Sequence, residues 1–220
     1  MFPILHHNQV LRKIHLADPE TWWTDDDLGG YEYQKTFNKD FMRMITPYIG
    51  DRHGVAVQAG GNCGWLTREI SKQFDYTYTC EPHYTSFICL CLNVPGPNVF
   101  KMQCCLGQFH ALVDISSSPD FPDASAGYVA GGGRIPMITI DSLNLTSCDL
   151  IQLDLEGFEY FALKGAKSTI EKYRPLICIE ICWNERFGVT NEQIKEFVMD
   201  ELGYSYVHNV NDDYIFKYIS

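Results

Sequence analysis

The spacing of hydrophobic positions changes near residue 54. Between Tyr33 and Tyr48, apolar residues recur at helical intervals, which predicts an amphipathic helix. Beyond residue 54, short apolar runs alternate with helical stretches, the pattern of βαβ units around a mostly parallel sheet. We therefore expect an N-terminal helical cover, residues 1–53, and an α/β domain, residues 54–220.

Seven strands are expected in the α/β domain, with the last two forming an antiparallel pair around a turn-forming Asn-Asp-Asp segment. The expected strands are 55–59, 76–80, 99–104, 149–154, 176–182, 204–210 and 214–218. The expected helices are 65–74, 84–93, 157–173 and 191–202. The stretch between the third and fourth strands is expected to be a loop with a β excursion. Such a mixed sheet has helices on both of its faces.

Composition and charge narrow the class of protein. A chain of 220 residues with 45% hydrophobic content can bury one sizeable core. Its net charge of −11 comes from acidic residues spread along the chain. This charge disfavours the binding of a phosphate-rich partner, so nucleic acid is not expected as a substrate. The chain shows no basic leader with a long apolar stretch and no segment of membrane-spanning length, so we expect a cytoplasmic protein without membrane association.

The nine cysteines lie mostly in apolar segments and are expected to be reduced core thiols. The close pairs at 89–91 and 104–105 lack the two-residue spacing of zinc ligands. The acidic residues form no defined octahedral set for a divalent cation. No metal is therefore expected.

A glycine-rich turn follows the first buried strand. Gly60, Gly61 and Gly64 let the backbone approach a ligand closely, while Asn62 breaks the G-x-G-x-x-G spacing of a dinucleotide site. The turn therefore favours a smaller ligand, whose carboxylate and amine can meet backbone groups and the Asn62 amide. A nicotinamide-dependent oxidoreductase shares the turn but not this spacing, and it is the weaker enzyme alternative.

Strand ends supply three further candidates for the same site. Glu81 lies about twenty residues beyond the turn, where a carboxylate can accept hydrogen bonds from both hydroxyls of a ribose. The alternative for Glu81 is a helix cap before Pro82. Gln103 and Cys104 end the third strand, where the sheet order would place an adenine ring.

Five elements in this order resemble the FkbM family of methyltransferases. They are VAVQAGGNCGW at 55–65, CEP at 80–82, ITIDSL at 138–143, LIQLDLEGFE at 150–159, and LKGA with PLICIE between 163 and 180. The resemblance covers about residues 54–182 and implies a class I, Rossmann-like methyltransferase fold: a mixed seven-stranded sheet with helices on both faces and an antiparallel C-terminal strand. It implies S-adenosylmethionine as cofactor, with the binding residues Gln58, Gly60, Gly61, Asn62, Gly64, Glu81, Gln103 and Cys104.

Two positions depart from the family pattern. Gln58 stands where the family usually has Asp, and Gln152 stands where Lys is common. An acidic residue at 58 would help to bind the cofactor ammonium. The alternative to an active enzyme is therefore a catalytically weak or inactive binding or scaffold protein that retains the fold.

Asp154 and Glu156 are the catalytic candidates. Methyl transfer to oxygen needs an aligned acceptor and usually a base for the hydroxyl proton. Asp154 ends the central fourth strand, at the sheet edge where doubly wound folds bind ligands. Either residue is expected to orient and deprotonate an acceptor hydroxyl. The alternative is that Asp154 caps the helix beginning near Gly157 and that Glu156 or Glu159 lies favourably in its first turn. Glu180 is either a paired structural acid or a wall of the acceptor pocket.

The expected reaction is O-methylation of a small molecule or glycan, the acceptor class that the resemblance implies. The fourth strand is not followed by the Asn-Pro-Pro-Tyr type of element that resembles amino-group methyltransferases, which favours oxygen over nitrogen. The oligomeric state is left open.

Overall fold

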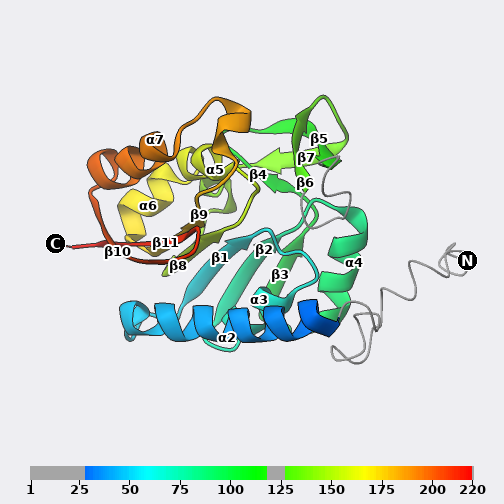
Figure 1. The fold of residues 1–220 in the computed structure, drawn as a ribbon, viewed down its shortest axis with the longest axis horizontal. Coiled ribbons are helices and arrows are strands. Elements are labelled where there is room, and N and C mark those ends of the chain that lie inside the picture. Colours follow the sequence, from blue (N-terminus) through cyan, green and yellow to red (C-terminus); the bar gives the residue numbers. More distant parts are fainter. Residues whose placement is uncertain (1–27, 118–126, 220) are drawn as a thin grey trace, which may run out of the picture.

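A seven-stranded mixed sheet lies at the centre of the molecule (Figure 1). The computed structural model describes residues 28–117 and 127–219. From one edge to the other the strands are β10 (Tyr204–Val210), β11 (Asp213–Tyr218), β9 (Leu176–Glu180), β8 (Leu150–Leu153), β1 (Val55–Ala59), β2 (Tyr76–Cys80) and β3 (Val99–Met102). β11 is antiparallel to both neighbours, and the other neighbouring pairs are parallel. The expected fold class is confirmed.

Helices pack on both faces of this sheet. The helices are α2 (Leu28–Ile49), α3 (Trp65–Ile70), α4 (Tyr84–Asn93), α5 (Glu159–Lys164), α6 (Lys167–Tyr173) and α7 (Asn191–Glu196), with shorter turns η5 (Asp141–Leu143), η6 (Asn184–Phe187) and the π-helical η7 (Phe197–Glu201). In Figure 1, α2 runs along the lower side of the strands, and α5, α6 and α7 lie on the opposite side. Within the described residues, none of these helices is long and apolar enough to cross a membrane.

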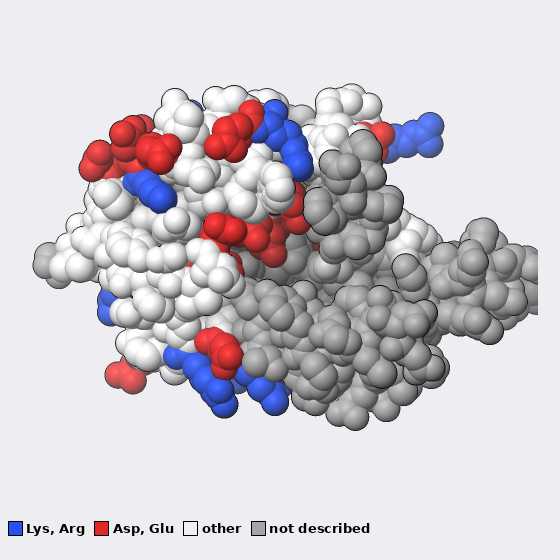
Figure 2. Space-filling view, in the orientation of Figure 1, with Lys and Arg blue, Asp and Glu red and all other residues white. Residues whose placement is uncertain are grey.

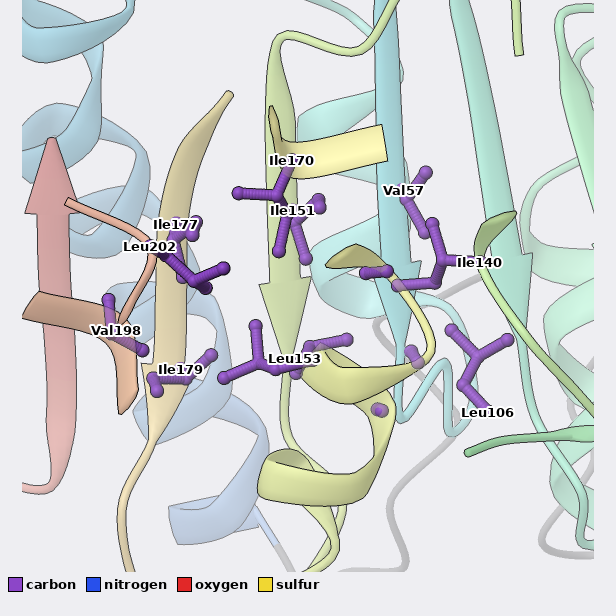
Figure 3. Packing of buried hydrophobic residues seen from close by; sticks show 14 of the residues in the cluster. Val57, Leu106, Ile140, Ile151, Leu153, Ile170, Ile177, Ile179, Val198 and Leu202 are labelled. Carbon is purple, nitrogen blue, oxygen red and sulfur yellow. The ribbon is translucent and has the colours of Figure 1, made fainter. Parts of the chain in front are cut away.

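Alternating side chains of the central strands build the two halves of the core. Ala56 and Leu150 belong to the buried cluster that includes side chains of α2. Val57, Ile151 and Ile177 point the other way, into the cluster that α5, α6 and α7 complete (Figure 3). Because successive side chains of a strand point to opposite faces, strands buried on both sides are apolar throughout. This explains the continuous apolar runs in the sequence.

The helix α2 packs against the sheet and shares a buried cluster with it. It spans Leu28–Ile49, somewhat longer than the amphipathic run at 33–48, and its buried residues Phe41, Met42 and Ile45 belong to the same cluster as β1 and β8. The first part of the expected N-terminal cover, residues 1–27, lies outside the described residues. The boundary between cover and domain stays a prediction.

The chain after β3 forms more structure than the expected loop with a β excursion. A second, four-stranded sheet has the order β4 (Cys105–Leu106), β7 (Ile135–Ile138), β5 (Ala111–Ser117) and β6 (Gly127–Gly131). The expected third strand, 99–104, ends earlier because Cys105 leaves the large sheet and pairs with Met137. In Figure 1 this small sheet lies beyond the upper ends of β1, β2 and β3.

The expected single helix over 157–173 is wrong: it is divided into α5 and α6 at Gly165. A Cβ atom on Gly165 would lie 2.0 Å from the carbonyl oxygen of Gly107, so the chain before β5 passes directly against this point. The Gly165 carbonyl accepts a hydrogen bond from the Asp141 N–H at 2.9 Å. Contacts with distant segments therefore interrupt a stretch whose local pattern is helical.

Candidate active site

A cleft lies between the carboxyl ends of β1, β2 and β8 and the small sheet. Its empty volume is about 660 Å³ with the adjoining solvent space included. Its polar lining includes Gly60, Asn62, Glu81, Asp154 and Glu156, and its less polar lining includes Cys104, Cys105, Leu106, Ile115 and Val129. Figure 2 shows acidic side chains gathered in a hollow on one face of the molecule. Six of the ten predicted site residues line this cleft.

The glycine turn after β1 is held against the end of β8. Gly60 has a φ of 80°, and a Cβ atom there would lie 2.0 Å from the Asp154 carbonyl oxygen, so only glycine fits. The N–H groups of Gly60 and Gly61 both donate to the Cys80 carbonyl, and that of Gly64 donates to Gly61. These amides are thus bonded within the protein. A ligand can therefore approach the backbone of the turn closely and contact the side chain of Asn62.

Gly61 and Gly64 lie behind the cleft surface. A Cβ atom on Gly61 would meet Thr79 at 2.8 Å, and one on Gly64 would meet Val94 at 2.7 Å. Both glycines therefore allow the turn to pack against β2 and α4. Their prediction as cofactor-binding residues stays a prediction, and the structure gives them a packing role.

Gln58 is buried, with 1% of its surface exposed, and does not line the cleft. Its side-chain Nε2 donates to the Gly60 carbonyl at 3.0 Å, and its Oε1 accepts a hydrogen bond from the Thr67 hydroxyl at 2.9 Å. The Thr79 hydroxyl donates to the same oxygen. Gln58 therefore ties the turn to α3 and β2, and its assignment as a cofactor-binding residue stays a prediction.

Glu81 lies at the base of the cleft with 6% of its surface exposed. One carboxylate oxygen accepts the Asn62 N–H at 2.7 Å, and the other accepts the His83 N–H at 2.7 Å. Burial raises the pKa of Glu81 to about 7, although the two backbone hydrogen bonds oppose the shift. His83 directly precedes α4, so Glu81 supports a helix start as well as facing the cleft.

The two remaining cofactor candidates, Gln103 and Cys104, follow β3 but differ in their position relative to the cleft. Gln103 is exposed, its Nε2 lies 3.5 Å from the Pro82 carbonyl, and it does not line the cleft. Cys104 lines the cleft, and its Sγ lies 3.5 Å from the Sγ of Cys80. The structure therefore brings Cys104 to the site and leaves Gln103 outside it.

Asp154 and Glu180 form a hydrogen-bonded pair of carboxyl groups. Burial raises the pKa of Asp154, and the hydrogen bond to Glu180 opposes this shift. Burial and then the charge of Asp154 raise the pKa of Glu180 to about 9. With this raised pKa, Glu180 keeps its proton at neutral pH. The Asp154 side chain is exposed to solvent and lines the cleft. In the sequence, this pair is indicated by Glu180, an acidic residue at the end of the apolar strand β9.

Asp154 does not cap the following helix. The residue before α5 makes no side-chain capping bond, and the Leu155 N–H donates to Glu159, the first residue of that helix, at 2.5 Å. Glu159 is fully buried, and burial raises its pKa to about 8.

Glu156 lines the cleft with a φ of 54°. This left-handed conformation is uncommon for a non-glycine residue and is often found at functional sites.

Residues 63–206, more than half of the chain, match the family model of the Methyltransferase FkbM domain. The chain belongs to the FkbM methyltransferase family. This family uses S-adenosylmethionine as its cofactor. The match includes the segments that carry Glu81, Cys104 and Asp154, and it extends beyond β9 into β10.

Solved structures share the fold of this FkbM-family chain at low sequence identity. A methyltransferase FkbM from Methylobacillus flagellatus KT superposes with a TM-score of 0.53 and 18% identity, over 76% of this chain and 44% of its own length. A magnesium protoporphyrin IX methyltransferase from Synechocystis PCC 6803, solved with bound SAH, gives a TM-score of 0.53 and 10% identity, over 94% and 91%. The chain thus spans less than half of the Methylobacillus protein. No curated protein sequence matches it.

Among the described residues of this FkbM-family chain, no group of three or more His, Cys, Asp or Glu side chains is arranged to hold a metal ion. The lining residues that were missed as site candidates include four of the apolar wall, Leu106, Ile115, Val129 and Phe158. Three of them come from the small sheet, whose position no motif indicates.

Proposed function

We propose that this chain transfers a methyl group from S-adenosylmethionine to a hydroxyl oxygen of a small molecule or glycan. The observation that carries the proposal is the position of Asp154, a carboxylate that lines the same cleft as Gly60, Asn62 and Glu81. In this arrangement one carboxylate, Glu81, serves the cofactor, and another, Asp154, remains for the acceptor. The family membership supports the reaction class.

The cleft has the chemistry that S-adenosylmethionine requires. Glu81 keeps lone pairs beyond its two backbone hydrogen bonds, and these can accept ribose hydroxyls. Leu106, Ile115 and Val129 form an apolar wall suited to a purine ring, and Asn62 can meet the amino-acid group. When bound, the cofactor supplies a methyl group on a sulfonium centre.

Asp154 would hold the acceptor hydroxyl and take its proton. Its partner Glu180 keeps its proton at neutral pH and can donate a hydrogen bond that orients the Asp154 carboxyl group and opposes the rise in its pKa. The acceptor end of the cleft holds several carboxyl groups, and none of the described residues that line the cleft is a Lys or Arg. An anionic acceptor would be repelled there, so a neutral or cationic hydroxyl compound fits best.

The test is methyl transfer from labelled S-adenosylmethionine to a panel of hydroxylated acceptors. We expect Asp154→Asn to lower kcat by about 100-fold or more, the effect of losing a positioned base. Glu156→Gln tests the second candidate, and Asp200→Asn, at an exposed residue in η7, is the matched control. Full activity of both cleft variants, with folding and cofactor binding retained, would reject the catalytic assignment.

A scaffold without catalytic activity is the second candidate function. It is favoured by one observation: the Gln58 side chain is fully engaged with Gly60, Thr67 and Thr79 and carries no charge for the cofactor ammonium. Calorimetry with S-adenosylmethionine and S-adenosylhomocysteine separates the two candidates. Absence of binding at high micromolar cofactor would favour the scaffold, and binding would favour the enzyme.

A further inference from the structure

Three thiols line the cleft where β2 and β3 end. Cys80 is the last residue of β2, and Cys104 and Cys105 follow β3. The two strands are hydrogen-bonded neighbours, with Cys80 in register with Met102, so their ends are held together by a short stretch of sheet. The Sγ atoms of Cys80 and Cys104 lie 3.5 Å apart. A disulfide requires about 2.05 Å, so a small side-chain movement joins them.

The two thiols differ in acidity. The hydrogen bond between them lowers the pKa of Cys104, against the effect of burial. The same hydrogen bond, together with burial, raises the pKa of Cys80. Cys104 is therefore the thiol that ionises first, and the thiolate is the form of cysteine that reacts with oxidants. Cys80 keeps its proton and is in place to react second.

We propose that Cys80 and Cys104 form a reversible oxidation site at the cofactor end of the cleft. The oxidant is a peroxide. The Cys104 thiolate attacks one peroxide oxygen, forming an S–O bond as the O–O bond breaks and hydroxide leaves, which takes up the proton that Cys104 released. The Cys80 sulfur then attacks Cys104, forming the S–S bond as the S–O bond breaks, and its proton leaves with the departing hydroxide as water. Two thiols and one hydrogen peroxide yield one disulfide and two waters.

The disulfide alters the part of the cleft that faces the cofactor. Glu81 directly follows Cys80, and its carboxylate holds the Asn62 N–H of the glycine turn. Closing the sulfur pair draws the Cys104 side chain toward Cys80 and away from its place in the cleft wall. This consequence for cofactor binding rests on the proposed function, whereas the disulfide itself is tested separately.

The first experiment maps the disulfide in the full chain. The reduced protein is treated with hydrogen peroxide, digested without reductant and analysed by mass spectrometry, with dithiothreitol as the reversal. We expect a Cys80–Cys104 linkage that persists in Cys105→Ser, the adjacent buried thiol, and is absent in Cys104→Ser. Cys104→Ala replaces the serine variant if that variant does not fold. No linkage in the wild type, or a linkage through Cys105, overturns the proposal.

The second experiment compares cofactor binding by the reduced and the oxidised protein in calorimetry with S-adenosylmethionine. We expect the oxidised form to bind about tenfold more weakly or worse, the effect of losing about one hydrogen bond to the cofactor. Recovery of affinity with dithiothreitol supports the proposal, and equal affinity of the two forms overturns its effect on the cofactor. If the reduced protein does not bind cofactor, the proposed function fails, and peptide mapping alone decides the oxidation site.

Discussion

At the scale of single residues, the cleft combines carboxyl groups whose pKa values differ through their surroundings. Glu81 is fixed by two backbone N–H groups yet has a pKa raised to about 7 by burial. Glu180, with a pKa raised to about 9, holds a proton beside Asp154. A buried carboxyl group is charged at neutral pH only where hydrogen bonds or a protonated neighbour offset its desolvation. Each residue therefore has a different task available to it.

Glu81 makes cofactor affinity depend on pH. With a pKa of about 7, it is mostly protonated at pH 6 and mostly charged at pH 8, and only the charged form accepts both ribose hydroxyls. We expect the affinity for S-adenosylmethionine to rise about tenfold from pH 6 to pH 8, following the ionised fraction. Calorimetry across this range measures it. In Glu81→Gln the affinity is lower and this rise is lost; an unchanged rise in that variant would assign it to another group.

At the scale of elements, close backbone approaches decide where helices end. The division between α5 and α6 lies where Gly165 meets the Gly107 carbonyl. Asp141 then holds the start of α6, because its carboxylate accepts the Thr169 N–H at 2.7 Å and the Ser168 N–H at 3.1 Å. One glycine and one acidic residue thus determine where α5 ends and α6 begins.

Gly165→Ala should destabilise the fold. Its new Cβ atom would lie 2.0 Å from the Gly107 carbonyl oxygen, a backbone atom that moves only with its segment. We expect a loss of about 1–3 kcal/mol in the free energy of unfolding, measured by denaturant titration. Gly131→Ala is the matched control, because nothing lies within 4 Å of the corresponding Cβ position. Equal stability of the two variants would contradict the close approach.

At the scale of the whole molecule, the acidic groups around the cleft couple stability to pH. Burial raises the pKa of Glu81 and Asp213 to about 7, of Glu159 to about 8 and of Glu180 to about 9. The folded chain therefore binds more protons than the unfolded chain between the ordinary carboxyl pKa and these raised values. Under the linkage relation, the free energy of unfolding then falls as pH rises.

We expect the melting temperature to fall between pH 6 and pH 9. The stabilisation is present below the ordinary carboxyl pKa and is lost as pH rises through the raised values. Differential scanning calorimetry at several pH values measures the decline. Glu159→Gln should flatten it, since Glu159 is fully buried, and Glu196→Gln, at an exposed position in α7, should leave it unchanged. A melting temperature that rises across this interval would contradict the raised pKa values.

The local pattern of apolar and polar residues was sufficient to predict many of the strands and helices. The expected strands 55–59, 76–80 and 204–210 have the observed bounds, as does the helix at 84–93. Buried strands and amphipathic helices are encoded by apolar periodicity within a few residues, so they can be identified without tertiary contacts. The motif order likewise led to the family and to the segments that line the cleft.

Tertiary structure decided what depends on contacts between distant segments. The four-stranded small sheet, the interruption of the 157–173 helix at Gly165 and the Asp154–Glu180 pair all join residues far apart in the chain. The same is true of Gln58, whose side-chain amide is hydrogen-bonded to Gly60, Thr67 and Thr79. Burial and hydrogen-bond partners set the charge and reach of a side chain, and they exist only once the segments have packed.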